Sequence, residues 1–184
     1  MRVISGRFKG VALTTPKSGT RPTTDRTKEA IFSHLDSWGV LDDARVLDLF
    51  AGSGQLGLEC LSRGAESCLF CDNDRAALRA VGQNITACGV QDRCTVFAGD
   101  FRSAVAGHSP GSFDIILLDP PYGGKILEDA LRAIEQFDIL AARGIIVCES
   151  ACGDKVYIPA APYEKLREYR YGSTAITTLM RNAE

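Results

Sequence analysis

Short apolar runs alternate with segments of helical periodicity along the chain from residue 44 onward. Unbroken apolar runs of this length predict buried strands, and apolar residues repeating every three to four positions predict amphipathic helices. The expected strands span residues 45–50, 67–71, 94–99, 113–119 and 144–150. The expected helices span residues 54–63, 74–88 and 126–137. This alternation predicts an α/β fold in which helices cover both faces of a mostly parallel sheet.

The two ends of the chain depart from this rhythm. Residues 2–16 have the pattern of two short strands about the turn GRFKG, which predicts a hairpin. Apolar residues at helical spacing predict a helix over 26–38, with Thr24 or Asp25 as its N-cap. Residues 163–181 predict an antiparallel hairpin about YGS.

Charge is unevenly distributed, although the net charge of the 184 residues is only −2. Residues 1–28 carry seven basic residues and one acidic residue, a net charge of +6, so the rest of the chain carries −8. A basic segment of this kind favours contact with a polyanion, and a solvated basic terminus without a partner is the alternative. We predict a basic N-terminal extension over residues 1–40 and a main domain over residues 41–184.

The composition limits the classes of protein that fit. No apolar run approaches the roughly 18–20 residues of a membrane span, and no apolar segment follows the basic N-terminus as in a secretory signal. Seven cysteines are scattered, and the C-x-x-C pair of Cys68 and Cys71 lies in an expected strand. No second pair with His spacing completes a zinc site, so we expect buried, reduced cysteines, no metal and a cytoplasmic protein.

Three glycines, Gly52, Gly54 and Gly57, follow the first strand of the alternating region in G-x-G-x-x-G spacing. Glycines at a strand-to-helix turn permit a tight turn and the close approach of a ligand to the backbone. Asp72 lies 20 residues beyond Gly52, at the end of the second strand, where an acid reaches ribose hydroxyls. This spacing favours an adenosine-containing cofactor over glycines that serve only the turn.

Further acidic residues decide between cofactors. Asp48 lies four residues before Gly52, and a carboxylate there disfavours the pyrophosphate of a dinucleotide. It suits S-adenosylmethionine, which carries an ammonium and a sulfonium and no phosphate. Asp100, at the end of the third strand, is placed to accept a hydrogen bond from an adenine amino group. Asn73 and Phe101, which each follow one of these acids, complete the predicted cofactor contacts.

The segment DPPY, residues 119–122, follows the fourth expected strand and so falls on the same rim of the sheet. Two consecutive prolines cannot continue a central strand, because proline lacks a backbone donor and fixes φ. The exocyclic amine of a nucleobase is a poor nucleophile and must be held by acceptors in line with a methyl donor. Asp119 supplies one acceptor, and the carbonyl of Pro120, held rigid by Pro121, supplies another. Tyr122 offers a face on which a base stacks.

The motifs together resemble those of one family. The chain contains, in this order, MRVISGRFKG, RPTTDRTKEAIFSHL, VLDLFAGSGQLGLECLSRGA, DPPY and YGST. In this combination it resembles the bacterial 16S rRNA guanine-N2 methyltransferases over essentially its whole length, and DPPY resembles motif IV of amino-directed nucleic-acid methyltransferases. The resemblance implies a Rossmann-like class I methyltransferase fold whose seven-stranded sheet has one antiparallel strand. It also implies methylation of a guanine exocyclic amine in 16S rRNA, within an assembling 30S subunit.

Residue roles follow from the same resemblance. The implied cofactor residues are Asp48, Gly52, Gly54, Asp72 and Asp100. Residues 119–122 are implied to hold the guanine, and Arg21 and Thr23 lie in the RPT loop that closes over the site. The basic arm, with Arg7, Lys9 and Arg21, is implied to contact phosphates. Gln55 departs from the small residue that the family often has, and we expect it to alter the fit near the methionine tail.

Other functions remain open at this point. Methylation of DNA adenine or cytosine uses a similar DPPY segment, although no separate target-recognition domain is visible after residue 150. A Rossmann-like module that binds RNA without catalysis would show no turnover. An NAD-linked oxidoreductase is disfavoured by Asp48 and by the lack of an obvious hydride-site residue. His34 and His108 have the pattern of structural or solvent-exposed residues. We expect a monomer.

Overall fold

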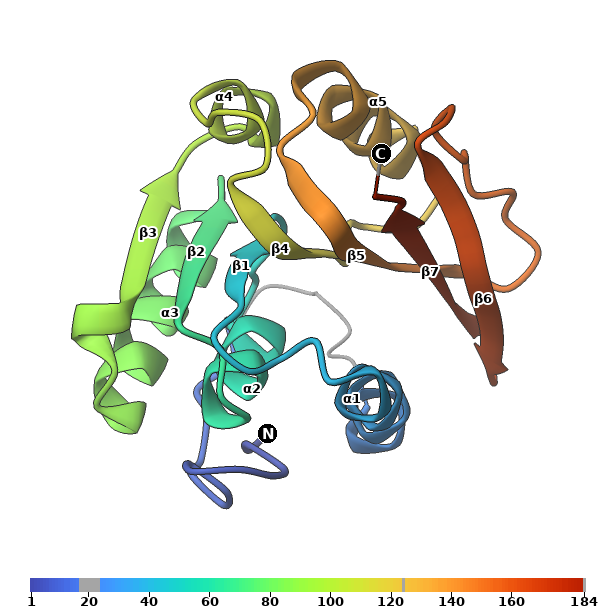
Figure 1. The fold of residues 1–184 in the computed structure, drawn as a ribbon. Coiled ribbons are helices and arrows are strands. Elements are labelled where there is room, and N and C mark those ends of the chain that lie inside the picture. The colour runs from blue at the N-terminus through green and yellow to red at the C-terminus, as the bar shows by residue number, and fades with distance from the viewer. Residues whose placement is uncertain (17–23, 124, 184) are drawn as a thin grey trace.

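A seven-stranded sheet with helices on both faces forms the centre of the protein (Figure 1). The computed structural model describes residues 1–16, 24–123 and 125–183. The strands are β1 (Arg45–Asp48), β2 (Ser67–Asp72), β3 (Cys94–Ala98), β4 (Phe113–Leu118), β5 (Leu140–Ala151), β6 (Tyr163–Tyr171) and β7 (Thr174–Arg181). The α-helices are α1 (Asp25–Trp38), α2 (Gln55–Ser62), α3 (Arg75–Cys88), α4 (Phe101–Ala106) and α5 (Ile126–Phe137), and a short 3-10 helix spans Gln91–Arg93.

The strand order is β3-β2-β1-β4-β5-β7-β6, and β7 is antiparallel to both of its neighbours. The other six strands therefore share one direction, which confirms the predicted sheet with one antiparallel strand. Chain order reverses between β1 and β4, which pair side by side. Ligands of open α/β sheets bind beyond the carboxyl ends of the strands at such a reversal. The fold therefore predicts a ligand site beyond the carboxyl ends of β1 and β4.

Alternate strand residues pack into two separate apolar layers. Val46 and Ile115 join the layer that contains the buried faces of α1, α2 and α3. Their neighbours Leu47 and Ile116 join the layer beneath α4 and α5. Because successive side chains of a strand point to opposite faces, an unbroken apolar strand needs helices on both sides. The apolar runs in the sequence correspond to these doubly covered strands.

Caps fix the ends of helices α1 and α3. The Thr24 side chain accepts from the backbone N–H of Thr27 at 3.2 Å, so Thr24 is the N-cap of α1. Gly39 and Gly89 end α1 and α3 in the left-handed conformation that glycine adopts readily. Of the two N-cap candidates in the sequence, Thr24 and Asp25, the structure uses Thr24.

The predicted N-terminal hairpin forms only in part. A single bridge pairs Arg2 with Ala12, and no strand forms among described residues 1–16. The backbone donors of Ile4 and Ser5 bond to the carboxylate of Glu59 on α2, at 2.9 and 3.0 Å. The segment therefore docks on α2 through these two donors, while backbone hydrogen bonds from Val3 to Val11 and from Leu13 to Met1 join its two arms.

Two further differences from the sequence prediction concern an additional helix, α4, and the start of strand β5. Helix α4 was not predicted, since six residues give too short a periodic pattern. Its N-cap is Asp100, whose side chain accepts from the backbone N–H of Arg102 at 2.7 Å. Strand β5 begins at Leu140, four residues before the expected start at Gly144. Its antiparallel pairing with β7 covers Ile145 to Ala151.

Two helical glycines are expected to respond oppositely to alanine substitution. A Cβ on Gly57 would lie 2.4 Å from Cε1 of Phe70, whereas a Cβ on Gly82 would meet nothing within 4 Å. We expect Gly82→Ala to raise the free energy of unfolding by about 0.5–1 kcal/mol through helix propensity. Gly57→Ala is expected to lower it by about 1–3 kcal/mol through overpacking. Urea denaturation followed by circular dichroism measures both, and a Gly57→Ala protein as stable as the wild type would contradict the close packing of α2 on β2.

Candidate functional site

A cavity of about 1100 Å³ lies at the carboxyl ends of the parallel strands. Its walls come from the loops after β1, β2, β3 and β4, from the ends of β5 and β6, and from the start of α1. The lining includes these residues predicted from the sequence: Asp48, Gly52, Asp72, Asn73, Asp100, Phe101, Asp119, Pro120, Pro121 and Tyr122. The fold thus brings the glycine loop and the DPPY segment, which are far apart in sequence, into one cavity.

The glycine loop is shaped by backbone conformations that favour glycine. Gly52 and Gly54 have φ values of +56° and +77°, in the left-handed region. Gly52 lines the cavity, whereas Gly54 is the N-cap of α2 and lies against the side chains of Phe70 and Val81. Gly54 therefore serves the turn and the packing of α2 in this structure.

Asp72 ties the glycine loop to strand β2. Its Oδ2 accepts from the backbone N–H of Gly52 at 2.8 Å, and its Oδ1 accepts from that of Asp74 at 2.9 Å. Asp74 in turn caps α3 through the N–H of Ala76. The carboxylate is thereby held at the end of its strand, facing the cavity where the sequence spacing predicted it.

Asp48 lies beneath the glycine loop and is 1% exposed. Its Oδ2 accepts from the backbone N–H of Gly57 at 3.1 Å. Burial raises the pKa of Asp48 to about 7, the Gly57 hydrogen bond opposes this rise, and the charge of Asp72 adds to it. A carboxyl poised near neutrality at the floor of the cavity would become ionised next to a cationic ligand.

Tyr122 is held by a network that the sequence did not reveal. Its hydroxyl donates to Oε1 of Glu149 at 2.6 Å and lies 3.0 Å from Oγ1 of Thr174. Burial and the Glu149 carboxylate raise the pKa of the Tyr122 phenol, so it stays protonated and donates. Glu149, 27 residues away on β5, was not singled out in the sequence, and Thr174, 52 residues away at the start of β7, belongs to the YGST motif, for which no role was assigned.

Several residues outside the predicted set of site residues also line the cavity. Gln55 is buried, and its Oε1 has no hydrogen-bond partner among the described residues. The turn between β6 and β7, residues 172–173, also forms part of the cavity wall. Three basic residues also border the cavity: Arg26, Arg102 and Arg170. Only the assembled sheet places this turn and these three arginines in the same cavity as the glycine loop.

Two of the residues predicted to contact phosphates, Arg7 and Lys9, lie apart from the cavity. Arg7 and Lys9 are exposed and are not among the residues that line it. Their turn is bonded to the far end of α2, where the N–H of Arg7 donates to the carbonyl of Ser62 at 2.7 Å. Because α2 has eight residues, this turn lies about 12 Å beyond the start of the helix at the glycine loop. Arg21 and Thr23 lie outside the described residues.

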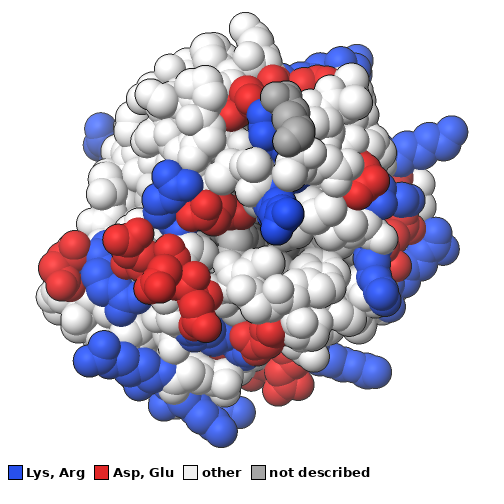
Figure 2. All heavy atoms as spheres, in the orientation of Figure 1, with Lys and Arg blue, Asp and Glu red and all other residues white. Residues whose placement is uncertain are grey.

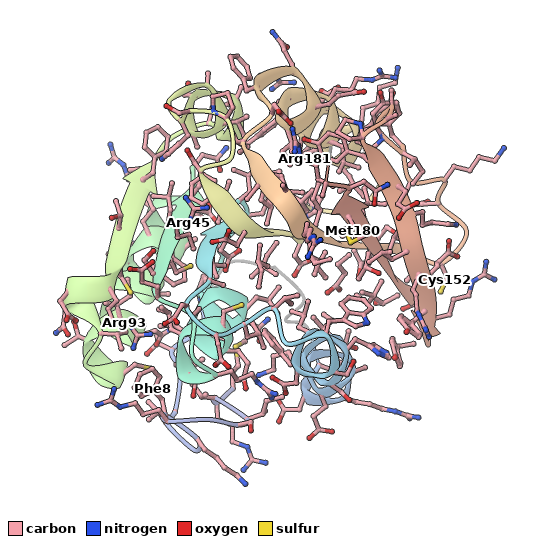
Figure 3. The ribbon with its side chains drawn as sticks, in the orientation of Figure 1. Phe8, Arg45, Arg93, Cys152, Met180 and Arg181 are labelled. Atoms are coloured by element: carbon pink, nitrogen blue, oxygen red, sulfur yellow. The ribbon has the colours of Figure 1, made fainter. Side chains whose placement is uncertain are left out.

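The opposite rim carries basic residues that are already paired. Arg45, at the start of β1, bonds to Asp114, and Arg181, at the end of β7, bonds to Asp138. Both arginines are labelled in Figure 3, and on the same face Figure 2 shows blue and red spheres interspersed. This face therefore offers acids and bases together, whereas a polyanion requires an excess of bases.

Remaining candidates from the sequence have structural places. Cys68 and Cys71 are buried and free, as expected, whereas Cys152 is exposed. His34 stacks on Tyr169 with ring centroids 4.1 Å apart. Among described residues, no group of three His, Cys, Asp or Glu side chains could hold a metal ion. No described helix is long and apolar enough to cross a membrane.

Comparison with known proteins places the chain in a family. The family described as "Conserved hypothetical protein 95" matches residues 1–180. The chain belongs to this family. Among its relatives is the Escherichia coli (strain K12) protein named "Ribosomal RNA small subunit methyltransferase D", 34% identical over 193 aligned residues, which cover 100% of this chain and 91% of that protein. Another is the Bacillus subtilis (strain 168) protein named "Putative rRNA methyltransferase YlbH", 41% identical over 81% of this chain and 82% of its own length.

Solved structures agree with this placement. The structure titled "Putative methyltransferase yhhF from Escherichia coli" superposes with a TM-score of 0.89 and 32% identity, covering 100% of this chain and 99% of that one. The family membership confirms the resemblance found in the sequence motifs and the Rossmann-like methyltransferase fold.

Proposed function

We propose that this member of the family is a methyltransferase that transfers a methyl group from S-adenosylmethionine to the N2 amine of a guanine in 16S rRNA. The observation that carries the proposal is the single cavity shared by the glycine loop and the DPPY segment. Methyl transfer needs the donor and the acceptor amine in line and in contact. A cavity lined by both motifs supports such an arrangement, and the names of the relatives support an rRNA substrate.

The residues present fit S-adenosylmethionine. The Asp72 carboxylate suits the ribose hydroxyls, and Asp100 at the end of β3 suits the adenine amino group. Asp48 and the unpartnered Oε1 of Gln55 lie on the side of the glycine loop, where acceptors suit a cationic methionine moiety. Every one of these groups is an acceptor, which matches a ligand rich in donors and positive charge and poor in phosphate.

Catalysis by this chain rests on positioning. When bound, S-adenosylmethionine supplies an activated methyl group on a sulfonium. Asp119 accepts one N–H of the guanine amine and the Pro120 carbonyl accepts the other, which directs the amine lone pair towards the methyl group. The Tyr122 ring stacks on the base, a contact worth about 1–3 kcal/mol. The surplus proton leaves to Asp119 or to water after transfer.

RNA binding is assigned to basic residues at two distances from the base. Arg26 and Arg170 border the cavity and suit the phosphates that flank a flipped nucleotide. The exposed Arg7 and Lys9 suit phosphates about one helix length away. Contacts spread in this way fit an RNA surface presented by a 30S assembly intermediate, since shape and looped bases are what proteins read in RNA.

The test is transfer of tritiated methyl from S-adenosylmethionine to three substrates. These are 30S particles, naked small-subunit rRNA and duplex DNA, each from cells that lack the enzyme. We expect label in N2-methylguanosine after digestion of a 30S or rRNA sample. Label in DNA adenine or cytosine would keep the chemistry and overturn the substrate. No label with a folded protein that binds the cofactor would favour a non-catalytic RNA-binding module.

A further inference from the structure

Two carboxylates stand side by side at the rim of the cavity. Leu118 of β4 and Cys148 of β5 are the last paired residues of these two strands, and Asp119 and Glu149 each follow one of them. Parallel strands lie about 4.8 Å apart, so two residues that directly follow a paired position leave the sheet close to one another. Both residues line the cavity. The catalytic segment is thus accompanied by a second acidic group that the transfer step does not require.

Glu149 is 7% exposed, and a buried carboxylate needs hydrogen-bond donors. One of its donors is the hydroxyl of Tyr122, at 2.6 Å from Oε1. A carboxylate has about four lone-pair sites, so it accepts further donors alongside this one. The Tyr122 contact also places Glu149 next to the ring on which the base is proposed to stack. An acceptor at the edge of a stacked base is in the position to read that edge.

Guanine differs from the other amino-bearing bases beside its amine. The N2 amine of guanine is next to N1–H, a donor. The N6 amine of adenine is next to N1, and the N4 amine of cytosine is next to N3, and both of these ring nitrogens are acceptors. A carboxylate beside the amine-holding residue therefore attracts guanine and repels adenine and cytosine.

We propose that Glu149 is the residue that selects guanine, by accepting the N1–H of the target base while Asp119 and Pro120 hold its N2 amine. This inference rests on the proposed function and deepens it. The DPPY segment by itself holds an amine of any base, so it leaves the choice of base open. Glu149 supplies that choice from a different strand.

The experiment replaces the target guanosine by 2-aminopurine riboside, which keeps the 2-amine but has an acceptor at N1. The nucleotide that the wild-type enzyme methylates is substituted in rRNA assembled into 30S particles, and kcat/KM is measured. We expect the wild type to favour guanine by at least about 100-fold, because a site built for an N–H rejects an analogue that lacks it. A 6-thioguanosine substrate, which keeps N1–H, controls for the altered position 6 and should remain a substrate.

The variant Glu149→Gln carries an amide N–H that can donate to N1 of 2-aminopurine. We expect it to lower the guanine to 2-aminopurine ratio of kcat/KM by at least about tenfold. Tyr122→Phe removes the hydroxyl partner but keeps the carboxylate and the ring, so it should retain the ratio while lowering the rate. Circular dichroism and thermal melting check that both variants fold.

Three outcomes would overturn the assignment. If Glu149→Gln lowers kcat/KM equally on guanine and on 2-aminopurine, Glu149 only holds Tyr122. A ratio that changes in Tyr122→Phe but not in Glu149→Gln would give the selection to the tyrosine. If Glu149→Gln does not fold, the wild type alone decides, because similar rates on guanine and 2-aminopurine contradict the proposal. Absence of any N2-methylguanosine from wild-type reactions would instead contradict the proposed function.

Discussion

Replacing Asp119 by Asn is expected to lower kcat for methyl transfer by about 100-fold or more, with the affinity for S-adenosylmethionine within about twofold of the wild type. Asp119 follows the last residue of β4 and lines the cavity beside Pro120. As the amine attacks, positive charge develops on its nitrogen, and a fixed carboxylate stabilises that charge. Loss of one such preorganised group typically costs about 10²–10³ in kcat. Single-turnover transfer of labelled methyl to the rRNA substrate measures the chemical step.

A matched control lies at the other end of the same strand. Asp114 on β4 bonds to Arg45 through both carboxylate oxygens, at 2.9 and 3.0 Å, and does not line the cavity. Arg45 holds the pKa of Asp114 below its usual range, so Asp114→Asn should reduce stability above the pKa of Asp114 and leave kcat unchanged. Asp119→Asn should instead lower kcat and leave the free energy of unfolding unchanged. An Asp119→Asn enzyme with wild-type turnover would remove Asp119 from the reaction.

Binding of S-adenosylmethionine is expected to strengthen as pH rises from about 5.5 to 7.5, because the cationic ligand prefers ionised Asp48. Burial raises the pKa of Asp48 to about 7 in the free protein, so binding below that pH should release a proton. The charged group facing it is Asp72, which has the same sign. The pH range stays below the titration of the ligand's own amine, near 7.7–8. Calorimetry in two buffers of different ionisation enthalpy measures affinity and proton release together.

Asp48→Asn separates binding from stability. In the free wild-type protein the folded state keeps the Asp48 proton up to about pH 7, whereas the unfolded chain loses it near pH 3.9. Stability attributable to this group therefore falls as pH rises between these values. At pH 7.5 the free energy of unfolding of the variant should exceed that of the wild type by at most about a few kcal/mol. Near pH 4 the two proteins should be equally stable. Its ligand affinity should be at least about tenfold weaker at pH 7.5 and lose the pH dependence. A wild type whose affinity is constant across this range would contradict the role of Asp48.

The sequence by itself determined the repeating part of the fold and the two motifs of the site. Unbroken apolar runs predict doubly covered strands because burial on both faces leaves no room for polar residues. The glycine spacing predicts the turn at Gly52 because few other residues adopt its positive φ. The prolines of DPPY end β4 because they cannot donate to a sheet. Each of these signals is local, since backbone conformation and periodic burial act over a few residues.

Only the tertiary structure decided which distant residues share the cavity. Glu149 meets Tyr122 through the parallel register of β4 and β5, and a one-residue slip would send each strand's side chains to the other face. The expected N-terminal hairpin forms only in part, and a carboxylate on α2, Glu59, satisfies the backbone donors of Ile4 and Ser5. Asp48 became a buried carboxyl with a raised pKa because α2 and the glycine loop cover it. Burial, register and long-range hydrogen bonds depend on how helices and strands pack against one another. Local sequence patterns act over a few residues and do not determine that packing.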